Sequence, residues 1–216
     1  MILIPQLSGS RLKPMMRHSR DPLPALRAAL EAPLSGSSDY DLNPDTVLPA
    51  NRKLRPAAVL VAIEPHRDGP RVLLTKRAAH LDHHPGQVAF PGGKVDPGDR
   101  DDNAAALREA QEEVGLDPSN VAVLGHLSAH ETVTGFRVTP VVGALAQTFT
   151  PVPEAGEVDE VFHVPLAFLS DLSNYNVEAR RWNNQWRRYY TVPYGPYYIW
   201  GATARILYGL AERMQR

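Results

Sequence analysis

The chain has 216 residues, of which 43% are hydrophobic and 22% charged, an ordinary globular composition. Its formal net charge of −1 gives no chain-wide basis for binding nucleic acid or an acidic membrane. It contains no cysteine, which excludes disulfides, cysteine-bound zinc and a thiol nucleophile. No apolar run approaches the roughly 18 residues of a membrane span and the start does not resemble a signal peptide, so we expect a cytoplasmic protein.

The first predicted element is a short helix at residues 21–32. This segment combines an acidic first position, an early proline and helical spacing of apolar residues. A loop rich in Ser, Gly, Asp and Pro follows it. We therefore expect residues 1–54 to be an N-terminal extension with one helix, and residues 55–216 to form the main domain.

Strands and helices alternate after this extension. Residues 57–63 are apolar and β-branched, which predicts a strand buried on both faces, and residues 71–75 predict the returning strand of a hairpin. Further strands are predicted at 88–90, 121–124 and 138–145, and helices at 102–114, 167–172 and 201–214. Helices on both sides of mixed strands predict an α/β/α sandwich around a mixed β-sheet.

The predicted helix 102–114 carries an acidic cluster. Glu109, Glu112 and Glu113 stand at i, i+3 and i+4, so their carboxylates project from one side of the helix. Like charges at this spacing repel one another, and a hard divalent cation such as Mg²⁺ or Mn²⁺ would relieve that repulsion. A solvated acidic helix face is the alternative interpretation, and the helix alone does not decide between the two.

A glycine pair upstream favours the metal interpretation. Gly92-Gly93 follows a predicted strand and precedes the helix, and a glycine turn there lets the backbone approach a phosphate or a metal closely. With Gly115 closing the helix, the arrangement resembles the box of the Nudix hydrolase family, G-x5-E-x7-R-E-U-x-E-E-x-G-U, where U is aliphatic. Gly93 supplies the first glycine and residues 108–116 supply the second half.

The chain departs from this box at one place. Asp99 occupies the first glutamate position, and eight residues rather than seven separate it from Arg108, which leaves open what Asp99 does. The resemblance implies that Glu109, Glu112 and Glu113 bind the metal and that Arg108 orients them through a salt bridge. It therefore implies that Glu112 and Arg108 take part in catalysis.

A second motif lies directly before the glycine pair. Lys76, Arg77 and a group of histidines place cationic and hydrogen-bonding groups opposite the acidic helix, as a polyanionic substrate requires. Residues 73–93 resemble the motif of the coenzyme A pyrophosphatase branch of Nudix enzymes, L-L-T-x-R-[SA]-x3-R-x3-G-x3-F-P-G-G. Every fixed position matches except that Asp82 stands where a basic residue is expected, and residues 199–204 are also similar to this branch.

Several polar residues allow more than one interpretation. His80, His83 and His84 could form a zinc cluster, although their spacing is irregular and no cysteine assists, or they could contribute only loop polarity. Glu157 is the first choice, ahead of Glu154 and Glu160, for a further metal ligand or a general base. For each glutamate taken singly, a solvated loop acid is the stronger interpretation.

Residues 175–198 are aromatic and basic, which predicts a two-strand ribbon that covers a core. Contact with the substrate is the second interpretation of this segment. A platform for single-stranded nucleic acid is the third, because the overall charge is near zero.

The resemblance implies hydrolysis of the pyrophosphate bond of coenzyme A or its thioesters, giving 3′,5′-ADP and 4′-phosphopantetheine or its acyl derivative. Mg²⁺ or Mn²⁺ would neutralise the diphosphate and acidify the attacking water, and the substrate would contact Lys76, Arg77, Gly92 and Gly93. Two alternatives remain: a Nudix pyrophosphatase for another nucleoside diphosphate derivative such as NADH or ADP-ribose, and a non-catalytic, ligand-sensing Nudix domain. The family analogy allows a homodimer, and neither nucleic acid nor a membrane is expected as a partner.

Overall fold

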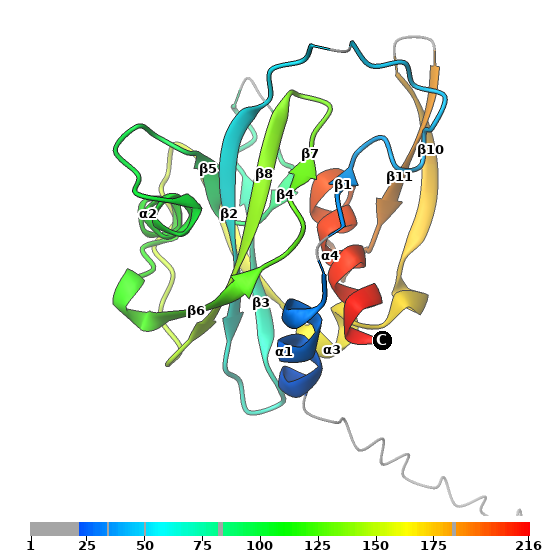
Figure 1. Ribbon diagram of the computed structural model, residues 1–216. Helices are drawn as coiled ribbons and strands as arrows, with labels where there is room; N and C mark the ends of the chain where they lie inside the picture. The colour runs from blue at the N-terminus through cyan, green and yellow to red at the C-terminus, as the bar shows by residue number, and fades with distance from the viewer. Residues whose placement is uncertain (1–21, 34, 50, 82–83, 183–184) are drawn as a thin grey trace, which may run out of the picture.

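Two layers of helices enclose a mixed β-sheet (Figure 1). The structure is a computed structural model, and it describes residues 22–33, 35–49, 51–81, 84–182 and 185–216. Helix α2 (Asp102–Val114) covers one face of the sheet, and α1 (Leu23–Glu31), α3 (Leu166–Leu169) and α4 (Gly201–Met214) cover the other. The predicted α/β/α sandwich is therefore confirmed.

Within the described ranges the sheet has nine strands. Its main path runs β1 (Ser37–Ser38), β7 (His130–Glu131), β8 (Phe136–Leu145), β2 (Arg55–Glu64), β3 (Arg71–Arg77) and β4 (Val88–Ala89). Three strands pair beside this path: β5 (Gly92–Lys94) with β2, β6 (Val121–His126) with β8, and β9 (Val158–Pro165) with β3. The β2–β8 and β1–β7 pairs are parallel and the other pairs are antiparallel.

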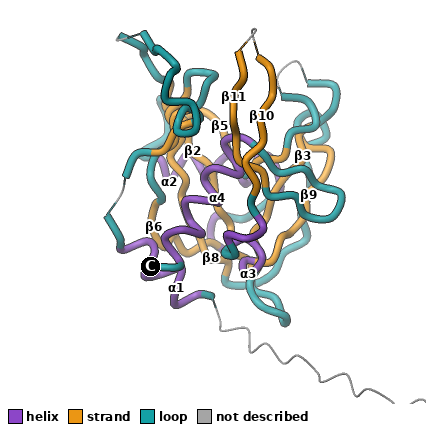
Figure 2. The backbone as a smooth tube through the Cα atoms, turned by 90° about the vertical axis from the view of Figure 1, so that its right-hand side faces the viewer, coloured by secondary structure: helices purple, strands orange, loops and turns teal. Residues whose placement is uncertain are grey.

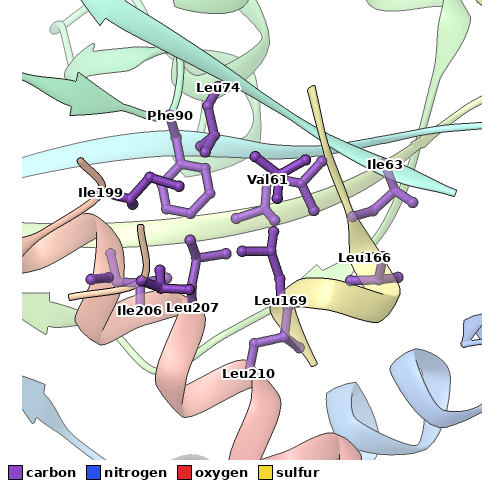
Figure 3. Close-up of a cluster of buried hydrophobic side chains, with 14 of the residues drawn as sticks. Val61, Ile63, Leu74, Phe90, Leu166, Leu169, Ile199, Ile206, Leu207 and Leu210 are labelled. Carbon is purple, nitrogen blue, oxygen red and sulfur yellow. The ribbon is translucent and has the colours of Figure 1, made fainter. Parts of the chain in front are cut away.

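Strand β2 is buried on both faces, as predicted from its continuous apolar run. Ala58 and Leu60 belong to the hydrophobic cluster under α2, whereas Val61 and Ile63 belong to the cluster under the other helices. Figure 3 shows the second cluster, in which Val61 lies among sheet residues that face Leu207 of α4. This alternation assigns each strand position to one face of the sheet.

Helix α2 begins and ends where the sequence predicts. The Asp101 side chain caps its first turn by accepting a hydrogen bond from the Ala104 N–H at 2.8 Å. Gly115 ends it in the left-handed conformation, with φ of 70°, and its N–H bonds the carbonyls of the last turn. Three alanines, Ala105, Ala106 and Ala110, are fully buried, so the helix backbone lies close to the sheet.

The described part of the N-terminal extension packs against the C-terminal helix. α1 contacts α4, and the Arg213 guanidinium donates hydrogen bonds to the carbonyls of Ala29 and Ala32. Further along, Arg205 of α4 forms an ion pair with Asp41 at 2.7 Å. The acidic cap predicted at Asp21 lies outside the described residues.

The predicted ribbon is confirmed as the strands β10 (Asn176–Trp182) and β11 (Gln185–Thr191), which project from the molecule (Figure 2). Its base is anchored, because Tyr190 stacks on Tyr208 of α4 with ring centroids 4.2 Å apart. The prediction that the ribbon covers a core is wrong for its outer part, where Trp182 and Trp186 are 48% and 71% exposed.

Other elements also differ from those predicted. Helix α3 is shorter than predicted, and two one-turn 3₁₀ helices lie at Pro118–Asn120 and Leu172–Asn174. Strands β1, β5, β7 and β9 were not predicted. No helix in the described part of the chain has the length and apolar character needed to cross a membrane.

Candidate active site

The glycine pair lies in a strand and not in the turn that the sequence predicts. Gly92 and Gly93 belong to β5, which pairs with the first half of β2. A Cβ on Gly92 would lie 2.5 Å from the backbone of Val59, so only glycine fits against β2 there. A Cβ on Gly93 would lie 2.5 Å from Oε1 of Glu109, so this glycine leaves room for a carboxylate of α2.

Gly92 also holds the second inward carboxylate of α2. Its N–H donates a hydrogen bond to Oε2 of Glu113 at 3.1 Å. The strand and the helix are thereby joined at both glycines, through Glu113 and Glu109. The two features that the sequence places in one motif thus form one site.

Arg108 connects the acidic residues to one another. Its Nη1 donates to Glu109 at 3.1 Å and to Glu112 at 3.0 Å. Its Nε and Nη2 donate to the two carboxylate oxygens of Asp99 at 3.0 and 2.9 Å, which also lowers the pKa of Asp99. Asp99, whose role the sequence leaves open, is therefore the main partner of Arg108, and only 6% of its side chain is exposed.

The inner glutamates lie in an environment that disfavours their charge. Glu113 is 4% exposed, and burial, together with the charges of Glu109 and Glu157, raises its pKa to about 7. Burial also raises the pKa of Glu109, although Arg108 opposes that change. In contrast, 59% of the Glu112 side chain is exposed, so this carboxylate faces solvent.

Replacing Glu113 with glutamine should stabilise the metal-free protein by on the order of 2 kcal/mol at pH 8, because it removes a buried charge. The folded-state pKa is above the unfolded value, so the cost of this carboxylate is absent below about pH 4.5 and complete above about pH 7. Urea unfolding of both proteins in EDTA at pH 8 and at pH 4.5 measures the difference. An equal or lower free energy of unfolding for the variant at pH 8 would contradict this reasoning.

The two predicted basic residues point to different places. The charge of Arg77 lowers the pKa of Glu113, which puts its guanidinium close to the acidic cluster. Lys76 follows Val72 and Leu74 on the face covered by α4, and it pairs with Glu160 of β9. Successive strand residues face opposite sides of a sheet, so the site brings together Arg77 and the glutamates but not Lys76.

The three loop glutamates also separate. The charge of Glu157 raises the pKa of both Glu109 and Glu113, so Glu157 belongs to the same cluster. Glu160 accepts a hydrogen bond from the Tyr197 hydroxyl on the other side of the sheet. Glu154 contributes its backbone N–H, which bonds the Glu113 carbonyl at 2.9 Å and holds this loop against the end of α2.

The donor set suits a hard divalent cation. Four carboxylates, Glu109, Glu112, Glu113 and Glu157, share one region, and burial together with the charges of neighbouring glutamates raises the pKa of Glu109 and Glu113. Among the described residues no three histidine or acidic side chains are arranged closely enough to hold a metal ion, and Arg108 forms hydrogen bonds with both Glu109 and Glu112. Carboxylate oxygens are nevertheless the ligands that Mg²⁺ and Mn²⁺ prefer.

The histidine group predicted upstream lies on the exposed loop between β3 and β4. His80 and His84 are exposed, while His83 and the departure at Asp82 lie outside the described residues. This loop returns to the strand through Gln87, whose carbonyl accepts the Arg77 N–H at 3.0 Å. None of the described histidines of this loop joins a metal-binding group.

Known proteins resemble this chain in sequence. The model of the NUDIX domain matches residues 53–185, more than half of the chain. The protein described as uncharacterized Nudix hydrolase NudL of Salmonella paratyphi B is 47% identical over 158 residues, covering 73% of this chain and 81% of the relative. NudL of Salmonella newport matches to the same extent.

Two solved structures are similar over part of the chain. RenU, a Nudix hydrolase of M. smegmatis, is 28% identical with a TM-score of 0.42, covering 52% of this chain and 71% of that chain. The NUDIX domain of Shewanella oneidensis NrtR, a structure of that protein with ADP ribose, is 23% identical with a TM-score of 0.42. That match covers 55% of this chain and 77% of the other.

Proposed function

The chain belongs to the Nudix family and is a Nudix hydrolase, and we propose that it hydrolyses coenzyme A or its thioesters. The reaction class is cleavage of the pyrophosphate bond in a nucleoside diphosphate derivative. For coenzyme A the products would be 3′,5′-ADP and 4′-phosphopantetheine, or its acyl derivative when a thioester is the substrate. The substrate assignment derives from the resemblance of residues 73–93 and 199–204 to the coenzyme A branch.

One observation carries the proposal: the carboxylates of α2 meet the glycine strand β5, with a free cationic side chain beside them. Glu109 lies against Gly93, and Glu113 is bonded to Gly92. Arg77 lies near Glu113, and no ion pair with another described residue occupies it. An anionic ligand at this edge would therefore meet backbone without side chains on one side and an arginine on the other.

Several residues of the site would orient the metal ligands and bind the diphosphate. Arg108 fixes the rotamers of Glu109 and Glu112, so both carboxylates are oriented before a ligand arrives. Arg77 would contact non-bridging oxygens of the diphosphate. When bound by Glu109, Glu112 and Glu113, Mg²⁺ or Mn²⁺ would supply charge neutralisation and a more acidic water.

A carboxylate that takes the proton of the attacking water must be ionised and accessible. Glu157 is our candidate, because it borders the cluster from the loop before β9. The exposed Glu112 is the second candidate. Lys76, on the opposite face of the sheet, would act only on a distant part of the substrate.

A panel assay tests the proposal. The protein is incubated with Mg²⁺ or Mn²⁺ and coenzyme A, acetyl-coenzyme A, NADH or ADP-ribose, and products are identified by mass spectrometry. Formation of 3′,5′-ADP from coenzyme A is the expected result. Turnover of NADH or ADP-ribose but not of coenzyme A would refute the substrate assignment, and no turnover of any of them would favour a ligand-sensing domain.

A further inference from the structure

A serine, a histidine and an aspartate form a hydrogen-bonded chain where the N-terminal extension joins the sheet. The Ser37 Oγ lies 2.9 Å from Nδ1 of His130, and Nε2 of His130 lies 3.0 Å from Oδ1 of Asp39. The second carboxylate oxygen of Asp39 accepts a hydrogen bond from the Val133 N–H at 2.9 Å. Both ring nitrogens of the imidazole and both oxygens of the carboxylate are therefore held by a partner.

The strand pairing fixes this geometry. β1 and β7 are parallel, and Ser37 is the register partner of His130, so their side chains leave the sheet on the same face. Asp39 directly follows β1, two residues after Ser37, and its N–H donates to the Glu131 carbonyl at 2.9 Å. Backbone hydrogen bonds between the extension and β7 thus bring the three side chains together.

The chemistry of the three side chains assigns the hydrogens of this chain. A carboxylate only accepts hydrogen bonds, so Nε2 of His130 carries the hydrogen that Asp39 accepts. In the neutral imidazole the lone pair then lies on Nδ1, where it accepts the hydrogen of the Ser37 hydroxyl. In a Ser-His-Asp triad the histidine takes the proton of the serine and the aspartate fixes the tautomer. Here the two ring nitrogens are exchanged, but each side chain has the same role.

Ser37 also lines a cavity of about 60 Å³ between the extension and α4, beside which β1 lies (Figure 1). Such a volume holds roughly four waters, so it accommodates a short acyl group. A Cβ on Gly36 would meet nothing within 4 Å, so the chain leaves open space next to the serine. The His130 side chain is fully buried, which strengthens its hydrogen bonds. The serine is thus partly accessible, whereas its proton acceptor is shielded from water.

The wall that α4 contributes to this cavity carries positive charge. Arg213 lines the cavity and donates hydrogen bonds to the carbonyls of Ala29 and Ala32. Its third partner is the Ser128 hydroxyl, which is also neutral. Among the described residues no carboxylate forms an ion pair with Arg213, although Glu212 lines the same cavity. A guanidinium with neutral partners would stabilise the negative charge that develops on a carbonyl oxygen during nucleophilic attack.

The hydrogen-bonded chain lies away from the acidic helix. His130 pairs with Val138 of β8, which pairs with Ala57 of β2. The next residue, Ala58, packs under α2, so the strand alternation puts Val138 and His130 on the opposite face, which α4 covers. The cavity beside Ser37 is therefore separate from the carboxylates of α2.

We propose that Ser37, His130 and Asp39 form a second catalytic site, at which Ser37 takes up a short acyl group from a carboxylic ester. The Ser37 Oγ attacks the carbonyl carbon while its proton passes to Nδ1 of His130. The bond from that carbon to the leaving oxygen breaks, and the leaving oxygen takes the proton from Nδ1 to form the alcohol. Water then attacks the acyl-serine in the same way, which releases the carboxylic acid and restores Ser37. Both steps use only the ester and water.

The test uses p-nitrophenyl acetate and the full chain in EDTA, which removes any contribution from a bound divalent cation. Peptide mapping after an acid quench identifies the acetylated residue, and absorbance follows the release of p-nitrophenolate. We expect the acetyl group on Ser37, and a hydrolysis rate lower by about tenfold or more in Ser37→Ala. Ser38→Ala is the matched control and should keep the rate, because this neighbouring hydroxyl instead accepts a hydrogen bond from the Tyr40 N–H.

Asp39→Asn distinguishes a catalytic arrangement from a purely structural one. Asparagine can accept from the Val133 N–H and donate to Nε2 of His130, so the thermal midpoint should stay within a few degrees of the wild type. The imidazole hydrogen then lies on Nδ1, which can no longer take the proton of Ser37. We therefore expect acetylation of Ser37 to be slower by about tenfold or more in this folded variant.

Two results would overturn the proposal: no acetylation of Ser37 in the wild type, or equal acetylation of Ser37 in the wild type and Asp39→Asn. Either result would mean that the three side chains only join the extension to the sheet. Hydrolysis of coenzyme A has no bearing on this test, because the assay contains neither that substrate nor a free divalent cation.

Discussion

Replacing Glu112 with glutamine is expected to lower kcat/KM for coenzyme A about 10³-fold without unfolding the protein. Glutamine keeps the size of the side chain but removes the negative charge that a divalent cation or a proton acceptor requires. Metal-assisted charge stabilisation contributes several kcal/mol to such reactions, and each 1.36 kcal/mol is a factor of ten. Steady-state kinetics in saturating Mg²⁺ measures the loss.

The fold should tolerate this change because 59% of the Glu112 side chain is exposed and its ion pair with Arg108 is only one of that arginine's contacts. The thermal midpoint is therefore expected to stay within a few degrees of the wild type. Glu31→Gln, on the exposed side of α1, makes the same chemical change far from the site and should retain full activity. Activity within tenfold of the wild type in Glu112→Gln would refute the role assigned to this residue.

Replacing Gly93 with alanine is expected to lower kcat about 10²-fold by displacing Glu109. The new Cβ would lie 2.5 Å from the Glu109 carboxylate, so that side chain must move away from β5. Displacement of a catalytic group by about 1 Å typically costs about 10²-fold in rate. The folded state should change by only about 1 kcal/mol, because the atom that must move is the end of a flexible side chain.

Two neighbouring glycines provide controls for this prediction. A Cβ on Gly98 meets nothing within 4 Å, so Gly98→Ala should leave both activity and stability unchanged. Gly92 has a φ of 153° and touches the β2 backbone, so Gly92→Ala should destabilise the fold itself. Kinetics and thermal unfolding of all three variants separate these outcomes. Full activity of Gly93→Ala would contradict the prediction that hydrolysis requires Glu109 in its present position.

Helix α2 could be predicted from the sequence because its causes are local. Asp101 caps the first turn, the apolar and acidic residues follow a helical period, and Gly115 provides the left-handed end. The three glutamates must then share a side of the helix, whatever surrounds it. The strand β2 was equally clear, because a continuous apolar run of that length is buried on both faces.

The features that could not be predicted from the sequence depend on pairing between strands that are far apart along the chain. Gly92-Gly93 has the composition of a turn, and only its partner β2 makes it a strand. β1 and β7 are two-residue strands that exist because residues nearly a hundred positions apart lie side by side. Such short strands leave no period to detect in the sequence.

The departure at Asp99 illustrates why spacing alone was ambiguous. The extra residue and the shorter acid appeared to remove this position from the motif, yet Asp99 accepts two hydrogen bonds from Arg108. The turn of residues 96–99, closed by the Asp99 N–H and the Asp96 carbonyl, brings the side chain back to the helix. Lys76 and Arg77 lie on opposite faces of the sheet because successive strand residues alternate, but which of them faces α2 depends on how β3 packs in the fold.

The net charge of −1 for the whole chain does not indicate where positive and negative side chains gather in the fold. Carboxylates gather on α2 and on the loop before β9, while Arg77 and Arg108 lie close to them. A chain-wide sum cancels these groups, although each acts within the Debye length of about 8 Å at physiological ionic strength. Local charge, and not the total, decides what this site can bind.

The central claim is that the carboxylates of α2 hold a divalent cation that hydrolysis of the diphosphate requires. The most direct measurement is the rate of 3′,5′-ADP release from coenzyme A by protein freed of metal with EDTA, before and after Mg²⁺ or Mn²⁺ is restored. We predict no release without the cation, full release with it, and no recovery in Glu112→Gln. Release at the same rate in EDTA, or full recovery in that variant, would contradict the account.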